Sequence, residues 1–265
     1  MGETRRFEEP GPFRAEHLRP GDGWELSNGR PFECLPTGGD GASRSSVGVR
    51  VLATDPKVES SGLDAGYAPT ANTLRAPDIA IGNVPDQPGW IPGVPPLAVE
   101  YAGSGQDERA LRLKIADLLA RGTRWIWVVR LDLPRRVEVH APGTPMVVRQ
   151  IGALLEAPGI LLNAVPVEAL FDENVANRLT LRNLLQREGY ESLDAVRDEG
   201  EAAGLARGRI EGLRASVAVG LRKRFGPLSA EVEGSLASAT SVVLESALVR
   251  VFDASSPEEV LRPGQ

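Results

Sequence analysis

Two carboxylates in this sequence stand where they could do chemistry together. Asp78 opens a short apolar run, 79–81, and Glu100 closes another, 97–99. A carboxylate at the end of a buried strand is costly unless its charge is compensated. If the two strands are neighbours, both carboxylates can lie at one end of a sheet, where they repel each other unless a proton or a cation intervenes. Magnesium suits such a pair, because it needs few carboxylates and keeps several waters.

A lysine close to Glu100 in the chain is the third candidate. The sequence has three lysines, Lys57, Lys114 and Lys223, and 27 arginines, so arginine is its usual cation. Lys114 lies early in a predicted helix, 107–122, beside the apolar stripe of that helix. A compact ammonium can orient a nucleophile or stabilise charge in ways that a guanidinium cannot. The alternative interpretation is a solvated lysine on the helix surface.

The elements that must position these residues follow from apolar periodicity and turn signals. The sequence predicts a hairpin over 24–35, turning at Asn28-Gly29, and a loop over 36–43. Strands are predicted over 61–69, 74–82 and 96–102, and strands over 124–131 and 135–141 follow the helix 107–122. Residues 45–54 alternate like a strand but also fit a helix. The order strand, strand, helix, strand, strand predicts an α+β (α/β) fold with a mixed sheet flanked by helices.

Composition excludes several classes of protein. The chain has 265 residues, 42% of them apolar and 25% charged, which supports a packed core. The net charge of −6 gives no global signature of nucleic-acid binding, so such binding would need a local patch. Cys34 is the only cysteine and there are two histidines, His17 and His140, so an intrachain disulfide is excluded and a zinc site disfavoured. With no signal-peptide pattern and no membrane-length apolar run, we expect a cytoplasmic protein.

The pattern changes to long helices after about residue 167. Helical periodicity covers 168–189 and then 192–226, where Gly200, Gly204, Gly208 and Gly212 recur every four residues. These glycines share a helix face, which permits close approach of a second helix and would suit a homodimer. They also weaken the helix, so a marginal helical tail is the other interpretation.

The order of these segments resembles the PD-(D/E)xK nuclease superfamily. The closest resemblance is to a bacterial family of restriction-endonuclease-like proteins whose catalytic lysine is displaced. The matching stretches lie within residues 20–172: WELSNGR, LRAPDIAIG, PPLAVEYAG, LRLKIADLLARG, RWIWVV, RRVEVH and LLNAVPVEALF. The family's spacing of eight residues between the lysine and the glycine that ends the helix is also present, from Lys114 to Gly122. The resemblance also implies that 45–54 is a helix. With the polar, Pro- and Gly-rich start of the chain and the helical pattern at its end, the predicted division is a flexible N-terminal arm (1–22), a nuclease-like domain (23–172) and a helical C-terminal extension (173–265).

The resemblance also implies roles for individual residues. Asp78 and Glu100 would ligate Mg²⁺ or Mn²⁺, with the backbone carbonyl of Tyr101 as a further ligand. Lys114 would replace the usual lysine two residues after the glutamate, where this chain has Ala102. Glu25 matches a further acidic position, which would hold a water at the metal. The implied reaction is hydrolysis of phosphodiester bonds, with DNA as the expected partner.

Two positions depart from the family pattern. Gly103-Ser104-Gly105 replaces a Ser-Pro-Ser-like turn after the strand, and Arg130 stands where the family has an aspartate. Neither change removes an implied ligand. An endonuclease that uses a metal is therefore the first hypothesis, with DNA contacts from Arg109, Arg112, Arg121 and Arg124. The second is an inactive nuclease fold that binds or assembles through its C-terminal helices, and a different hydrolase is the third. If Glu100 were only structural, we would expect Arg75 or Arg130 to pair with it.

Overall fold

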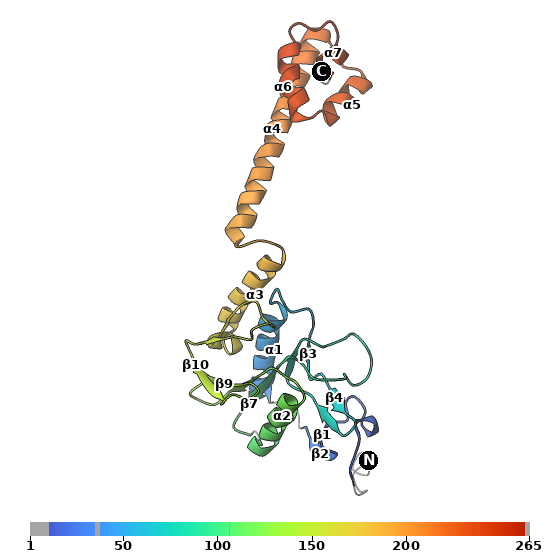
Figure 1. The fold of residues 1–265 in the computed structure, drawn as a ribbon. Helices are drawn as coiled ribbons and strands as arrows, with labels where there is room; N and C mark the ends of the chain where they lie inside the picture. The colour runs from blue at the N-terminus through green and yellow to red at the C-terminus, as the bar shows by residue number, and fades with distance from the viewer. Residues whose placement is uncertain (1–10, 35–37, 106, 263–265) are drawn as a thin grey trace. The chain divides into compact units, whose positions relative to one another are not determined.

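The computed structural model describes residues 11–34, 38–105 and 107–262 (Figure 1). The chain divides into two compact units, one ending at Glu191 and one beginning at Ser192. The first unit holds every strand of the described residues, and the second is entirely helical.

A mixed sheet is the centre of the first unit. Its strand order is β10-β9-β8-β7-β6-β3, and only the β7–β8 pair is parallel. All six residues of β7 are buried, as expected of a central strand with a parallel neighbour. The strands are β3 (Ser61–Leu63), β6 (Ile79–Ile81), β7 (Leu97–Ala102), β8 (Trp125–Arg130), β9 (Arg136–His140) and β10 (Val147–Gln150).

Helices cover both faces of this sheet (Figure 1). Alternate residues of β7 point to opposite faces. Val99 and Tyr101 pack with α1 (Gly39–Ala53), with α3 (Glu173–Arg187) and with the short 3-10 helix η3 (Val167–Leu170). Ala98 and Ala102 pack on the other face against Leu111, Ile115 and Leu118 of α2 (Glu108–Ala120). Glu100 therefore lies on the α2 face of the sheet.

Helix α2 has clear signals at both ends. The Asp107 carboxylate accepts hydrogen bonds from the backbone N–H groups of Arg109 and Ala110, which satisfies two free donors of the first turn. Gly122 follows the last turn with φ = +111°, a conformation that glycine adopts at little cost. These signals fix where the helix begins and ends. Its apolar stripe of Leu111, Ile115 and Leu118 faces the sheet and so sets the position of Lys114.

A smaller sheet packs beside α2. Its order is β2-β1-β5-β4, built from β1 (Trp24–Ser27), β2 (Arg30–Glu33), β4 (Tyr67–Thr70) and β5 (Thr73–Arg75). β1 and β2 form the hairpin predicted at Asn28-Gly29, and both turn residues have positive φ. α2 contacts β1. A two-stranded sheet, β11 (Leu154–Leu155) with β12 (Val165–Pro166), completes the unit.

Several predicted elements differ from the structure. Residues 45–54 are helical, as the family resemblance implied, but α1 already begins at Gly39, so the predicted loop was wrong over residues 39–43. The predicted strands 61–69 and 74–82 each contain two short strands. Part of the predicted loose arm is packed: Ala15 and Leu18, around the short helix η2 (Ala15–His17), are buried against Leu26 and Leu74.

The second unit is a helical cluster around the C-terminal half of α4 (Leu193–Phe225). α5 (Ala230–Ser238), α6 (Ser241–Arg250) and α7 (Pro257–Val260) surround Val217 and Leu221 of that helix. α3 shares the core of the first unit through Ala176 and Leu179, and the domain boundary predicted at residue 172 stays a prediction. Among the helices described, none combines the length and apolarity that a membrane span requires.

Candidate active site

Asp78 and Glu100 lie at the same end of two neighbouring strands. β6 and β7 pair antiparallel with Ile79 opposite Val99, so one further step of that register brings Asp78 opposite Glu100. Opposite residues of an antiparallel pair share a face of the sheet. The backbone N–H of Tyr101 donates to Asp78 Oδ2 at 2.6 Å, which fixes the aspartate against the end of β7. The two carboxylates are therefore adjacent, as expected if the two strands are neighbours.

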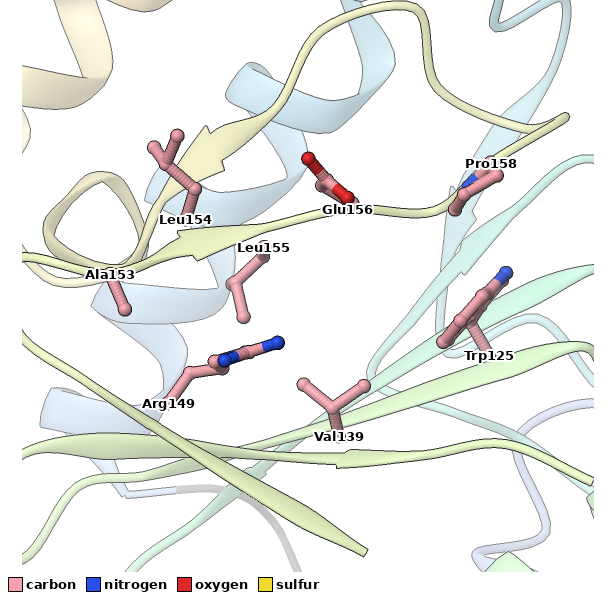
Figure 2. Close-up of a pocket in the computed structure, with 8 residues that line it drawn as sticks. All are labelled: Trp125, Val139, Arg149, Ala153, Leu154, Leu155, Glu156 and Pro158. Atoms are coloured by element: carbon pink, nitrogen blue, oxygen red, sulfur yellow. The ribbon is translucent and has the colours of Figure 1, made fainter. Parts of the chain in front are cut away.

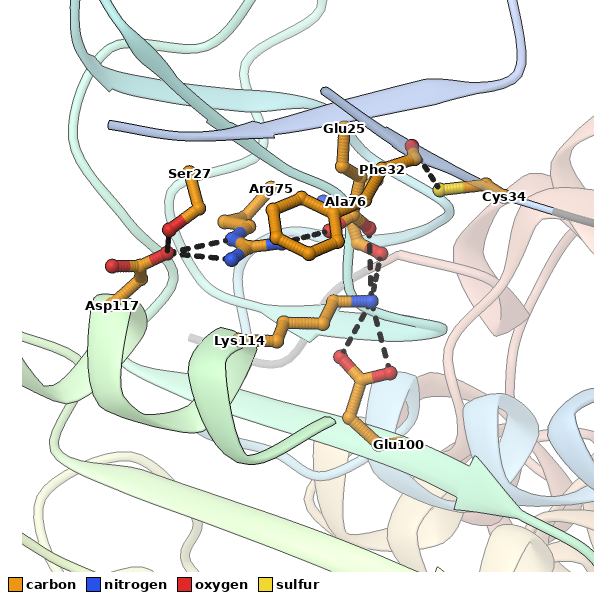
Figure 3. A network of polar contacts seen from close by, with 9 residues as sticks. All are labelled: Glu25, Ser27, Phe32, Cys34, Arg75, Ala76, Glu100, Lys114 and Asp117. Carbon is orange, nitrogen blue, oxygen red and sulfur yellow. Dashed lines mark hydrogen bonds and ion pairs between the residues drawn. The ribbon is translucent and has the colours of Figure 1, made fainter. Parts of the chain in front are cut away.

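Lys114 reaches the same place from α2 (Figure 3). Its Nζ donates to the Ala76 carbonyl at 2.6 Å and to Glu100 Oε2 at 3.0 Å. It also lies 3.0 Å from Glu100 Oε1 and 3.0 Å from Glu25 Oε1. The lysine side chain is only 13% exposed, so the solvated-lysine interpretation was wrong. The three N–H groups of the ammonium are thus matched by three acceptor residues: the carbonyl of Ala76 and the carboxylates of Glu100 and Glu25.

A buried arginine, Arg75, binds the carboxylate oxygen of Glu25 that Lys114 does not contact (Figure 3). Arg75 Nη1 donates to Glu25 Oε2 at 2.9 Å, and its Nε and Nη2 donate to Asp117 Oδ2 at 3.0 and 2.6 Å. Ser27 Oγ donates to the same Asp117 oxygen at 2.7 Å. The Ala76 N–H donates to Glu25 Oε1 at 3.1 Å. Both oxygens of Glu25 are therefore occupied by protein donors.

The charges in this cluster shift one another's pKa. Burial raises the pKa of Glu100 to about 8, with added repulsion from Asp78 and Glu25 and an opposing attraction from Lys114. Burial also raises the pKa of Asp78. Burial acts in the same direction on Glu25, but Lys114 and Arg75 outweigh it and lower the pKa of that carboxyl. The carboxylates outweigh burial at Lys114 and raise its pKa, so the ammonium stays charged.

The donor set of Asp78 and Glu100 fits a hard divalent cation. Glu100 Oε1 is buried and accepts no hydrogen bond of acceptable geometry, although it lies within ion-pair distance of Lys114. The N–H and C=O of one strand residue point the same way, so the Tyr101 carbonyl lies on the Asp78 side of β7. Two carboxylates and a carbonyl, completed by water, form a set that Mg²⁺ accepts. Within residues 11–34, 38–105 and 107–262, no three His, Cys, Asp or Glu side chains gather in a ready metal-binding group.

Two residues of the site were missed from the sequence. Asp64 follows β3 with φ = +49°, and its N–H donates to the Asp78 carbonyl at 3.3 Å; its charge adds to the raised pKa of Asp78. Asp117 lies one turn after Lys114 on α2. That spacing of i to i+3 was a usable signal, because both residues lie beside the buried stripe of the helix.

Neither arginine proposed as a structural partner of Glu100 pairs with it. Arg75 binds Glu25 and Asp117, while Arg130 binds Glu108 and Glu138. Arg130 thus joins the start of α2 to β8 and β9. The arginine partner expected of a purely structural Glu100 is absent among the described residues, and Lys114 takes its place.

A pocket elsewhere on the first unit does not contain these residues (Figure 2). It is lined by side chains that include Trp125, Val139, Arg149 and Leu155. Trp125, Val139 and Leu155 belong to the core on the α1 face of the sheet. Glu100 and Lys114 lie on the α2 face, so this pocket and the carboxylate cluster are separate sites.

Comparison with known proteins finds a similarity of structure. No family model and no curated protein matches the chain. A solved structure from Anabaena variabilis ATCC 29413, described as "a putative nuclease belonging to DUF820", aligns with a TM-score of 0.52 and 18% identity, over 62% of this chain and 99% of that one. The fold is restriction-endonuclease-like. It is a mixed α+β fold with a central sheet flanked by helices and a long helical C-terminal region. At this identity the similarity establishes the fold alone.

Proposed function

We propose that this chain is a nuclease that requires a divalent metal and hydrolyses phosphodiester bonds of DNA. The observation that carries the proposal is the meeting of Asp78, Glu100 and Lys114 at the ends of β6 and β7. Each residue comes from a different element, and Glu100 and Lys114 are largely buried. The pairing of β6 with β7 does not itself require two carboxylates beside a buried lysine. Metal-assisted hydrolysis of a phosphodiester does use carboxylate ligands for the metal and a cationic side chain.

Asp78, Glu100 and the Tyr101 carbonyl would hold Mg²⁺ or Mn²⁺. When bound, the cation would stabilise the charge that develops on the phosphate and lower the pKa of the attacking water. Lys114 is placed to orient that water or to stabilise the phosphate, by exchanging one of its present contacts for the substrate. Its raised pKa keeps it protonated, which suits electrostatic stabilisation better than proton abstraction.

Glu25 has a different role in this proposal from the one that the resemblance implied. Its carboxylate is bound by Arg75, the Ala76 N–H and Lys114. A carboxylate with both oxygens occupied holds its partners in place more readily than it recruits a water. We therefore assign Glu25 to positioning Lys114, with Arg75 and Asp117 fixing Glu25 in turn.

Binding of DNA would rest on a local basic surface, because the net charge of the chain is −6. Arg109, Arg112, Arg121 and Arg124 are all exposed, on or directly after α2. Exposed arginines contact phosphates without reading sequence. This arrangement favours DNA binding along α2, next to Lys114.

A protein that assembles through its C-terminal unit is the second candidate function. It is favoured by the closed set of contacts around Lys114, which leaves no ammonium proton without a neighbour. In such a protein the carboxylate cluster would be a structural remnant of the fold. The two candidates differ in one property: only the nuclease must bind a divalent metal at Asp78 and Glu100.

Cleavage of defined substrates tests the proposal. Supercoiled plasmid, single-stranded DNA and single-stranded RNA would each be incubated with Mg²⁺, Mn²⁺ or EDTA. We expect cleavage of DNA that needs the metal, and a loss of at least about 100-fold in Asp78→Ala and Glu100→Ala. Asp86→Ala, which changes an exposed aspartate outside the cluster, should cleave like the wild type. Absence of cleavage with every substrate, together with no metal binding by calorimetry, would favour the assembly protein instead.

A further inference from the structure

One face of α4 has the same spacing when read from either end. Leu193, Arg197, Gly200, Gly204, Gly208, Glu211 and Ala215 follow one another at steps of four, three, four, four, three and four residues. At 100° per residue these positions lie within about 40° of a common line along the helix. The pattern is symmetric about Gly204. Gly200 and Gly208 lie on either side of it, and Arg197 and Glu211 come next. Leu193 and Ala215 are the outermost pair.

All seven of these residues are exposed. Within the C-terminal unit, the buried face of α4 is a different one. Val217 and Leu221 point into the cluster formed with α5, α6 and α7. A methyl group built on Gly200, Gly204 or Gly208 would meet no described atom within 4 Å. The symmetric face is therefore open along its whole length within its own unit.

Within its own unit, the first half of α4 also lacks the packing that usually stabilises a helix. Every residue from Leu193 to Arg209 is exposed except Ala195, which is half-buried. Helices are marginal in water when packing does not support them, and three glycines weaken this stretch further. A helix of this composition would be stabilised by packing against a partner.

The charges of α4 identify the partner. Two charged residues lie on the open face: Arg197 before Gly204 and Glu211 after it. Asp198, Glu199 and Arg209 lie on other sides of the helix, so they do not face a partner bound to the open face. A second copy of α4 running antiparallel would therefore place opposite charge against each half of the helix. A parallel copy would place like charge against like.

We propose that the open face of α4 binds the same face of a second copy of this chain, antiparallel and centred on Gly204. Arg197 of each copy then lies directly opposite Glu211 of the other, so the interface contains this pair twice. The present contacts of Arg197 do not prevent this, because its ion pairs with Asp194 and Asp198 are between exposed groups and are weak. The absence of side chains at the glycines lets the two helices approach closely.

Cysteine cross-linking of the full chain distinguishes the orientations. In a Cys34→Ser background, which removes the exposed natural thiol, Gly200→Cys and Gly208→Cys would be oxidised separately and as an equal mixture. In the antiparallel pair, position 200 meets position 208 of the partner, and two copies of position 200 lie ~12 Å apart. We expect a disulfide-linked dimer from the mixture and little from either variant alone. Dimers from each single variant would indicate a parallel pair and overturn the proposal.

Sedimentation equilibrium tests whether the interface exists in solution and depends on its charge pair. We expect the wild type to dimerise, Arg197→Glu to weaken dimerisation by at least about tenfold, and Arg197→Glu with Glu211→Arg to restore it. Glu199→Arg, on the other side of the helix, is the matched control and should not follow this pattern of loss and rescue. A wild type that stays monomeric up to about 100 μM, so that its dissociation constant lies above that concentration, would overturn the proposal. Because the test needs no substrate, its outcome is independent of the nuclease activity.

Discussion

Replacing Lys114 by methionine tests the electrostatic description of the site without any assay of activity. Methionine keeps the length of the side chain but removes the ammonium from between Glu25 and Glu100. The lysine is 13% exposed and the two glutamates are 7% and 8% exposed, so water can replace little of the lost interaction. Removing one partner of a buried ion pair typically costs about 3–5 kcal/mol. We expect a loss of about 3 kcal/mol in the free energy of unfolding at pH 9.

The loss should depend on pH in a defined direction. The folded-state pKa of Glu100 is raised to about 8 from an ordinary value near 4.5, so its ionisation destabilises the folded state as pH rises through this window. Lys114 opposes that destabilisation, and because its own pKa is raised it stays charged at both pH 6 and pH 9. Lys114→Met should therefore cost less at pH 6, where Glu100 is largely protonated, than at pH 9.

Urea unfolding monitored by tryptophan fluorescence provides the measurement. All four tryptophans, Trp24, Trp90, Trp125 and Trp127, lie in the first unit, so the signal reports the unfolding of that unit. Adding Glu100→Gln to Lys114→Met should recover at least about 1 kcal/mol at pH 9, because the two residues interact directly.

Lys57→Met, at an exposed lysine, is the matched control and should have little effect. A loss of less than about 1 kcal/mol for Lys114→Met at pH 9, or an equal loss at both pH values, would refute this description of the site, since a buried pair should cost more.

Three further predictions concern the surroundings of the site. Arg75→Met leaves two carboxylates without their guanidinium and should destabilise the first unit by about 3–5 kcal/mol in the same urea experiment; a loss within about 0.5 kcal/mol would contradict the network. Gly48→Ala places a methyl group against the Tyr101 hydroxyl, so we expect a loss of about 1–3 kcal/mol that Tyr101→Phe partly recovers. Binding of Mn²⁺ should strengthen from pH 6 to pH 9 and release a proton, because Glu100 must ionise to bind it. Calorimetry in buffers of different ionisation enthalpy would detect that proton, and its absence would count against Glu100 as a ligand.

The parts of the fold that the sequence predicted are those with a strong local signal. α2 has an apolar stripe, a capping aspartate and a terminal glycine, and the structure confirmed it within a residue or two. The hairpin at Asn28-Gly29 was equally clear. The start of α1 was missed because Gly38, Gly39 and Gly41 are typical of loops. Packing of this helix on β6 and β7 outweighs that local preference, and the sequence does not display such packing.

The same distinction applies to the site. Asp78 and Glu100 were found because each lies at the end of an apolar strand, and their adjacency then depended only on the pairing of β6 with β7. The contacts of Glu25 with Arg75 could not be predicted, because β1 and β5 meet through long-range pairing. Asp64 was missed because its position beside Asp78 depends on a turn and on the pairing of β3 with β6. Long-range strand pairing determines which charges meet, and it leaves little trace in local spacing.

The most direct test of the central claim compares Lys114→Ala with Lys57→Ala in plasmid cleavage. Both variants remove one of the three lysines, but only Lys114 contacts Glu25 and Glu100. Cleavage in Mg²⁺ by the wild type and Lys57→Ala, and a loss of at least about 100-fold in a folded Lys114→Ala, is the result that we predict. Equal cleavage by both variants, or a loss that Asp78→Ala and Glu100→Ala do not share, would contradict the proposed site.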